Sequence, residues 1–174
     1  MSPRKKVEND LYISLLGFLL KKPGYAYDLY RYISKETVFF QIWYLKQSKF
    51  YALLDRLYSE GYLSRELLPG DQYPDRKLLS ITNEGIKRIN EFASSPVRRG
   101  REMRQEFLAK LYICRNFLQP LEGELIENQI QHCKKMIEEQ DLLVKSEKDE
   151  FLKLMIEYRR NQIQAMIDWL ASIL

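Results

Sequence analysis

Histidine, cysteine and glycine are scarce in this 174-residue sequence, and each scarcity argues against a class of function. The sequence has a single histidine, His132, and seven glycines, none of them in a glycine-rich phosphate loop. No paired acid and base follows a predicted strand either, so nothing in the sequence supports an enzyme. His132 and Cys133 are adjacent, and neighbouring helical residues point about 100° apart, so they cannot chelate one metal ion together. We therefore expect no catalytic residues, no bound metal and no cofactor.

Disulfides and membrane segments are also not expected. Cys114 and Cys133 form no CxxC motif, which suits a reducing cytosol. The longest apolar stretch, Leu11 to Leu20, is interrupted by polar residues and is too short to cross a bilayer. It also lacks the small-residue cleavage site of a secretion signal. The sequence predicts a cytoplasmic protein that does not contact membranes.

Charge is distributed unevenly along the chain. Residues 1–99 carry 17 Lys and Arg against 11 Asp and Glu, whereas residues 100–174 carry 11 against 13. The two parts therefore have formal charges of +6 and −2. The first part is the one suited to a polyanion such as DNA.

The first part of the chain shows the pattern of a winged helix-turn-helix. Hydrophobic spacing predicts one helix from Leu11 up to Pro23, a second over 25–34, and a third over 46–60 that Gly61 ends. Between the last two lies an apolar connector, 38–44. The core stripe expected for the third helix is Phe50, Leu53, Leu54 and Leu57.

The periodicity then changes from helical to extended. Residues 62–68 and 77–81 read as two strands joined by the polar loop 69–76, which predicts a β-hairpin. Thr82 is suited to cap a fourth helix that runs to about Phe92, with Ile86 and Ile89 facing inward. Three helices, a hairpin wing and a further helix give a winged helix-turn-helix domain over residues 1–95.

Residues 96–174 are predicted to be all helical, so the fold class is mainly α. Three helices are expected, over 100–118, 121–145 and 149–174, each with a broad apolar stripe. Helices of about 25 residues reach nearly 40 Å, so we expect their stripes to be buried against a second copy of the chain. The residues expected at this homodimer interface are Met155, Tyr158, Met166, Trp169, Leu170 and Ile173.

The order of several motifs resembles the PadR-type transcriptional regulators, in the branch with a long helical C-terminal (Vir-type) domain. The motifs are Leu15–Leu20, Gly24-Tyr25, Phe50-Tyr51 followed by Leu54, Leu57 and Gly61-Tyr62-Leu63, then Lys77–Thr82 with Gly85, Glu106-Phe107-Leu108 with Lys110-Leu111-Tyr112, and Trp169-Leu170. They span almost the whole chain. The resemblance implies a repressor that binds a palindromic operator as a homodimer and is released by a small molecule.

The DNA-binding residues are expected on the third helix and on the wing. Tyr51 falls where the family has a recurrent recognition-helix tyrosine, and Ser48-Lys49 stands where many relatives have Gly-Thr. The hydroxyls of Ser48 and Tyr51 and the ammonium of Lys49 can reach phosphates and base edges there, and wing cations are suited to phosphate contacts. The full set is Gln47, Ser48, Lys49, Tyr51, Arg56, Tyr73, Arg76 and Lys77. The alternative is an ordinary solvated helix face with a tyrosine packed on the hairpin.

Aromatic residues are dense in the first part of the chain. Phe40, Trp43 and Tyr44 could line a pocket for a small aromatic effector near the C-terminal helices, although filling the core is the commoner role of such side chains. For the whole protein, the alternative function is a protein–protein adaptor, with the winged helix as a packing module and no specific DNA binding. Salt-sensitive binding to a defined palindrome distinguishes the two functions.

Overall fold

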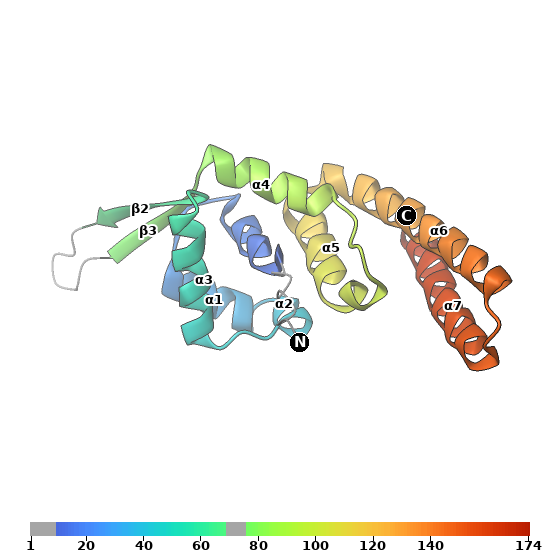
Figure 1. Cartoon of the computed structure of the whole chain (residues 1–174). Helices are drawn as coiled ribbons and strands as arrows, with labels where there is room; N and C mark the ends of the chain where they lie inside the picture. The colour runs from blue at the N-terminus through green and yellow to red at the C-terminus, as the bar shows by residue number, and fades with distance from the viewer. Residues whose placement is uncertain (1–9, 69–75) are drawn as a thin grey trace.

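The computed structural model describes residues 10–68 and 76–174 and shows a mainly α fold with one small sheet (Figure 1). The elements in chain order are the 3₁₀-helix η1 (Asp10–Leu19), β1 (Gly24–Tyr25), α1 (Ala26–Lys35), α2 (Phe39–Ile42), α3 (Gln47–Ser59), β2 (Leu63–Leu68), β3 (Arg76–Ile81), α4 (Asn83–Ser94), the 3₁₀-helix η2 (Gly100–Arg104), α5 (Glu106–Phe117), the 3₁₀-helix η3 (Gln119–Leu121), α6 (Glu122–Ser146) and α7 (Glu150–Ile173). The predicted winged helix-turn-helix followed by a helical region is confirmed.

The wing is a three-stranded antiparallel sheet with the order β1-β3-β2. The hairpin β2–β3 was predicted from the sequence, but β1 was not. Gly24 pairs with Leu79 and Tyr25 pairs with Leu78, so the chain adds a two-residue strand to β3 directly before α1. This strand ties the start of α1 to the base of the wing.

The predicted core stripe of α3 is confirmed, since Phe50, Leu53, Leu54 and Leu57 are its buried residues. The helix ends at the predicted glycine. Gly61 has φ of +80°, its N–H donates to the Tyr58 carbonyl, and the Tyr62 N–H donates to the Leu57 carbonyl. This pair of bonds is a Schellman motif, in which glycine adopts the left-handed conformation at little cost.

Helix α4 begins as predicted, because the Thr82 hydroxyl accepts a hydrogen bond from the Gly85 N–H at 3.0 Å. The prediction that Ile86 faces inward is wrong. Gly85, Ile89, Phe92 and Ala93 are the buried residues of α4, and Ile86 is exposed. Gly85 faces the backbone carbonyl of Tyr62. A Cβ atom added at position 85 would lie 2.2 Å from that carbonyl oxygen.

The single helix expected over 100–118 is in fact two helices. Gln105 has φ of −131° and ψ of −59°, which interrupts the helix between η2 and α5. Helix α5 then packs deeply against η1, where a Cβ atom added to Gly17 would lie 2.7 Å from Cδ1 of Ile113.

Helix α5 contributes to both hydrophobic clusters of the chain. Ala109 and Ile113 belong to the N-terminal core, whereas Phe107, Leu111 and Cys114 belong to a second core shared with α6 and α7. Because α5 joins the two cores, the domain boundary near residue 95 stays a prediction.

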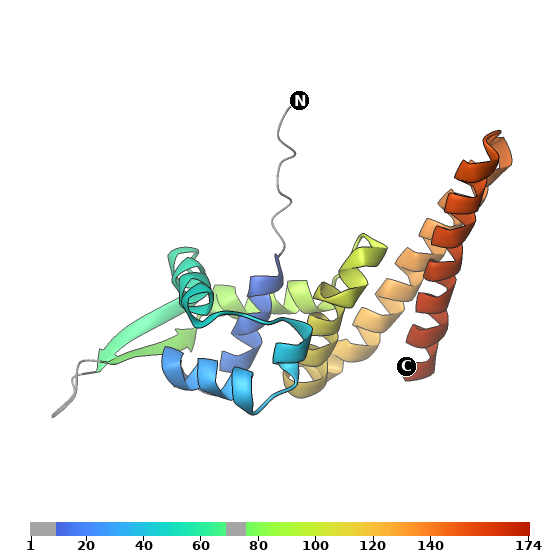
Figure 2. The same cartoon turned by 90° about the horizontal axis from the view of Figure 1, so that it is seen from below.

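The last two helices form an antiparallel hairpin that projects away from the winged-helix part (Figure 2). The sequence argument assumed that such long helices lack an equally long partner within the chain. In fact α6 and α7 have 25 and 24 residues and cover each other, with Ile156, Ile163 and Leu170 buried from α7. No helix in the described ranges is long and apolar enough to cross a membrane.

Candidate nucleic-acid interface

The N-terminal half of α3 presents a polar face to solvent. Gln47, Ser48, Lys49 and Ala52 are exposed, while the opposite face of the helix is buried in the core. The first turn has no acidic residue. Its unpaired N–H groups and the helix dipole therefore leave this end favourable for a phosphate or another anion.

A cleft of about 550 Å³ lies beside this face, between α1, α3 and the sheet. Tyr51 and Lys77, which are predicted site residues from two different elements, both line it. Tyr27 and Asp28, which the sequence reasoning did not select, line it as well. They follow closely after Pro23, where the first predicted helix ends, but the pairing of β1 with β3 was needed to place them beside α3.

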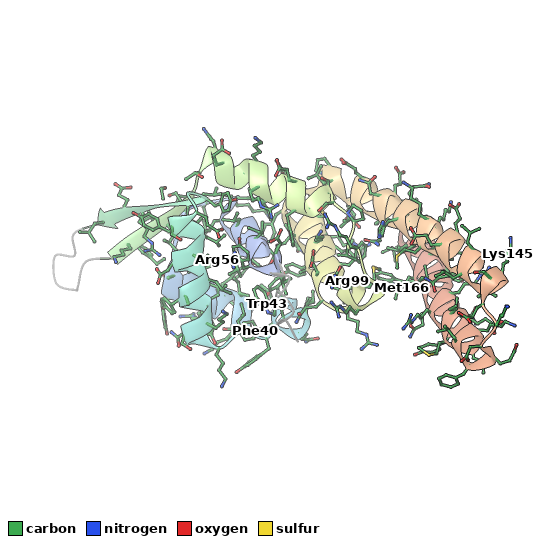
Figure 3. The ribbon with its side chains drawn as sticks, viewed as in Figure 1. Phe40, Trp43, Arg56, Arg99, Lys145 and Met166 are labelled. Atoms are coloured by element: carbon green, nitrogen blue, oxygen red, sulfur yellow. The ribbon has the colours of Figure 1, made fainter. Side chains whose placement is uncertain are left out.

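Arg56 lies at the far end of α3, at the upper part of the helix in Figure 3. Its Nε donates to Oε1 of Glu60 at 2.8 Å, and its guanidinium lies 4.0 Å from the centre of the Tyr12 ring. The Tyr12 hydroxyl donates to Oε2 of the same Glu60 at 2.8 Å. Burial, with this carboxylate, raises the pKa of Tyr12. Arg56 is thus part of an internal network at the C-terminal end of the helix.

The predicted wing residues are placed only in part. Lys77 in β3 is exposed. Arg76 is the first residue of β3, and Tyr73 lies outside the described residues. The hairpin carries Arg76 and Lys77 to the end of the sheet that points away from the helical region (Figure 1).

The aromatic residues predicted as an effector pocket pack in pairs. Phe40 contacts Tyr44 with ring centres 5.3 Å apart, and Trp43 contacts the buried Phe39 at 6.4 Å. Phe40 and Trp43 lie near the lower end of α3 in Figure 3. Tyr44 is 68% exposed, so this group borders solvent on one side.

The predicted dimerisation residues fall into two groups. Tyr158 and Trp169 are exposed on α7, and Met155 is half-buried. Leu170 is fully buried in the second core, and Met166 and Ile173 pack against the same core. Leu170 is therefore not on the surface that a second copy would meet.

Both cysteines are buried, Cys114 in the second core and Cys133 on α6. Burial raises the pKa of Cys114 to about 12 and also raises the pKa of Cys133. Thiols of this kind stay protonated and react slowly at neutral pH. In the described ranges, no group of three or more His, Cys, Asp or Glu side chains is arranged to hold a metal ion.

Comparison with known proteins gave solved structures only. No family model and no curated protein sequence matches the chain. The chain is similar to the Bacillus subtilis PadR crystallised with operator DNA, at 20% identity over 95% of this chain and 97% of that one, with a TM-score of 0.48. It is also similar to a PadR-like transcriptional regulator from Bacillus cereus, at 18% identity over 98% and 97% of the two chains, with a TM-score of 0.45. These proteins are of the same type, PadR, that the sequence motifs resemble.

Proposed function

We propose that the chain is a sequence-specific DNA-binding transcription regulator whose reading head is the N-terminal half of α3. The observation that carries the proposal is the exposed face of Gln47, Ser48, Lys49 and Ala52, next to a wing and on a helix whose other face is fixed in the core. Small and polar side chains on a rigid helix of this length fit the major groove of DNA.

Each residue has a distinct role in this proposal. Gln47 and Ser48 reach base edges, and Lys49 and Lys77 contact backbone phosphates. Tyr51 lines the cleft behind the reading face and sets the distance between α3 and the wing. Arg56, held by Glu60 and Tyr12, acts by positioning the helix, and Arg76 and Tyr73 extend the contacts along the wing.

We further propose a homodimer that binds a palindromic operator and represses transcription in the cytoplasm. A two-fold axis would place two α3 helices about one DNA turn apart. The exposed apolar side chains of α7, which include Leu154 and Tyr158, provide surface for the second copy. In Bacillus subtilis PadR the solved complexes hold operator DNA and p-coumaric acid. For this chain we propose only the classes of ligand. These are duplex DNA and a small aromatic effector, which contacts Phe40, Trp43 and Tyr44 and causes release of the DNA.

The test is fluorescence anisotropy with the DNA upstream of the protein's own gene, over a salt series, compared with random DNA of equal length. We expect saturable binding that weakens with salt. Lys49→Ala should weaken binding about tenfold and reduce the salt slope by about 1, because one phosphate contact is lost. Gln47→Ala should instead change the preference among operator sequences.

Lys145→Ala is the matched control, because it removes an equal charge from an exposed position near the tip of the α6–α7 hairpin, far from α3 (Figure 3). It should leave DNA affinity unchanged. Absence of any preference over random DNA would contradict the proposal and favour the adaptor function.

A further inference from the structure

A second cleft, of about 570 Å³, lies on the other side of the molecule from the wing, where the segment after α4 meets α6 and α7. One wall is formed by residues 98–104 and the other by α7, and α6 closes the floor. Figure 3 shows two of its residues, Arg99 beside α5 and Met166 toward α7. The volume is within the range of about 300–1,000 Å³ that is typical of small-molecule sites.

Arginines line much of the cleft, and none of the described residues that line it is acidic. Five arginines contribute to it, four from one wall and one from α7: Arg98, Arg99, Arg101, Arg104 and Arg159. Arg99 lies 4.0 Å from Glu102. The other four guanidiniums have no carboxylate within 4 Å among the described residues. Guanidiniums gathered around one hollow produce a positive potential that attracts anions.

The start of the backbone segment that carries four of these arginines is held by several hydrogen bonds, of which those to Gln129 are buried. The Gln129 side chain, which is buried, accepts from the Val97 N–H at 2.7 Å and donates to the Val97 carbonyl at 3.2 Å. Nε2 of His132 lies 3.3 Å from the Arg98 carbonyl. The Glu102 carboxylate accepts from the N–H groups of Arg98 and Arg99. The arginine wall is therefore preorganised on α6, which lowers the entropic cost of binding a ligand.

Apolar surface adjoins the arginines in the cleft. Met136 supplies it on the floor, and Ile163 and Met166 supply it on the wall formed by α7. This surface is suited to the organic part of a ligand that also carries anionic groups.

We propose that this cleft binds a small organic phosphate, with its phosphates between the arginines of residues 98–104 and Arg159, and its organic part on the floor. Phosphate is favoured over a single carboxylate because one carboxylate neutralises one guanidinium, whereas a di- or triphosphate presents several charges to the planar forks of arginine. The site does not depend on the DNA-binding function proposed for α3.

Isothermal titration calorimetry on the full chain tests the proposal, with inorganic pyrophosphate and ATP as probes and adenosine and acetate as comparisons. We expect one saturable site per chain for both phosphates, and tighter binding for ATP because of the floor. Adenosine and acetate should bind at least tenfold more weakly. Arg101→Gln, Arg104→Gln and Arg159→Gln change exposed side chains without ion pairs among the described residues, so folding should be preserved.

Each of the three substitutions should raise the dissociation constant of pyrophosphate about tenfold. The matched control Arg31→Gln, at an exposed position on α1, should leave it unchanged. Absence of saturable phosphate binding, equal binding of acetate, or unchanged affinity in the arginine variants would each overturn the proposal. An equal loss of affinity for random duplex DNA in the arginine variants would also overturn the proposal, because the arginines would then belong to a DNA-binding surface.

Discussion

Lys110 is a buried lysine at the junction between α4 and α5, with 2% of its surface exposed. Its Nζ donates to the carbonyl and the hydroxyl of Ser95 at 2.9 and 3.0 Å and lies 3.4 Å from Oε1 of Glu106. It also lies 4.6 Å from the centre of the Phe92 ring. Burial lowers the pKa of Lys110 and raises the pKa of Glu106, while the attraction between them acts in the opposite direction for both. This side chain links the end of the winged helix to α5.

Replacing Lys110 with methionine should therefore destabilise the protein by about 3 kcal/mol, because the Ser95 carbonyl and the Glu106 carboxylate lose their partner. Urea denaturation measures the free energy of unfolding. Lys134→Met, at an exposed position on α6, is the matched control and should change stability by less than about 0.5 kcal/mol. A loss below 1 kcal/mol for Lys110→Met would contradict the bridging role.

Cys114 gives a prediction of pH dependence. Burial raises its pKa to about 12 in the folded protein, so between roughly pH 9 and pH 12 only the unfolded state loses this proton. The thiol then lowers the free energy of unfolding by about 1.4 kcal/mol for each pH unit in that window. Cys114→Ala lacks this effect, so its stability deficit relative to the wild type should shrink by about 1.4 kcal/mol between pH 8 and pH 10. Denaturation in the presence of a reductant measures this, and a deficit independent of pH would show that the thiol is not buried.

At the scale of elements, the contact between α4 and the base of the wing depends on Gly85. Its missing Cβ would lie 2.2 Å from the Tyr62 carbonyl oxygen and 2.8 Å from Cγ1 of Ile81. Gly85→Ala should destabilise the protein by about 3 kcal/mol, since backbone atoms must move. Gly123→Ala, in α6 with no atom within 4 Å of the added Cβ, should be neutral or stabilising by up to about 1 kcal/mol. Thermal unfolding of both variants checks this, and equal melting temperatures would refute the close contact.

The sequence predicted the elements whose signals are local. Gly61 and Thr82 act at short range through the Schellman motif and the N-cap, and both were found from residue type alone. The strand β1 and the interruption at Gln105 were missed because both involve partners distant in sequence: β1 pairs with β3, and the Gln105 side chain donates to the Ile42 carbonyl. The predicted orientation of Ile86 was wrong for a similar reason. The close contact of Gly85 with the Tyr62 carbonyl determines which face of α4 is buried, and the hydrophobic spacing of the helix does not show this contact.

The candidate sites show the same limit at the scale of the whole molecule. The exposed residues on α3 follow from its apolar stripe, so Gln47, Ser48 and Lys49 could be predicted as a surface. The arginine cleft could not, although Arg98 to Arg104 is a visible run of cations. Arg159, on the second wall of the cleft, is 55 positions beyond Arg104 in the sequence. Only the tertiary fold brings it to the same cleft.

The outer face of the α6–α7 hairpin should determine the oligomeric state. Phe151, Leu154 and Tyr158 are 61–70% exposed on neighbouring turns of α7. A stable dimer needs about 800 Å² of such surface from each partner. We therefore expect a dimer by light scattering at micromolar concentration, and a monomer for Leu154→Glu, since a buried unpaired charge is costly at an interface.

The matched control is Val38→Glu, which adds the same charge at an exposed apolar residue outside the hairpin. It should leave the dimer intact. Because the proposed palindromic operator would engage two α3 helices at once, the monomeric variant should also lose most of its operator affinity while it keeps its fold by circular dichroism. If Leu154→Glu stays dimeric, the second copy docks elsewhere; if it becomes monomeric and binds the operator as tightly as before, recognition does not require two subunits.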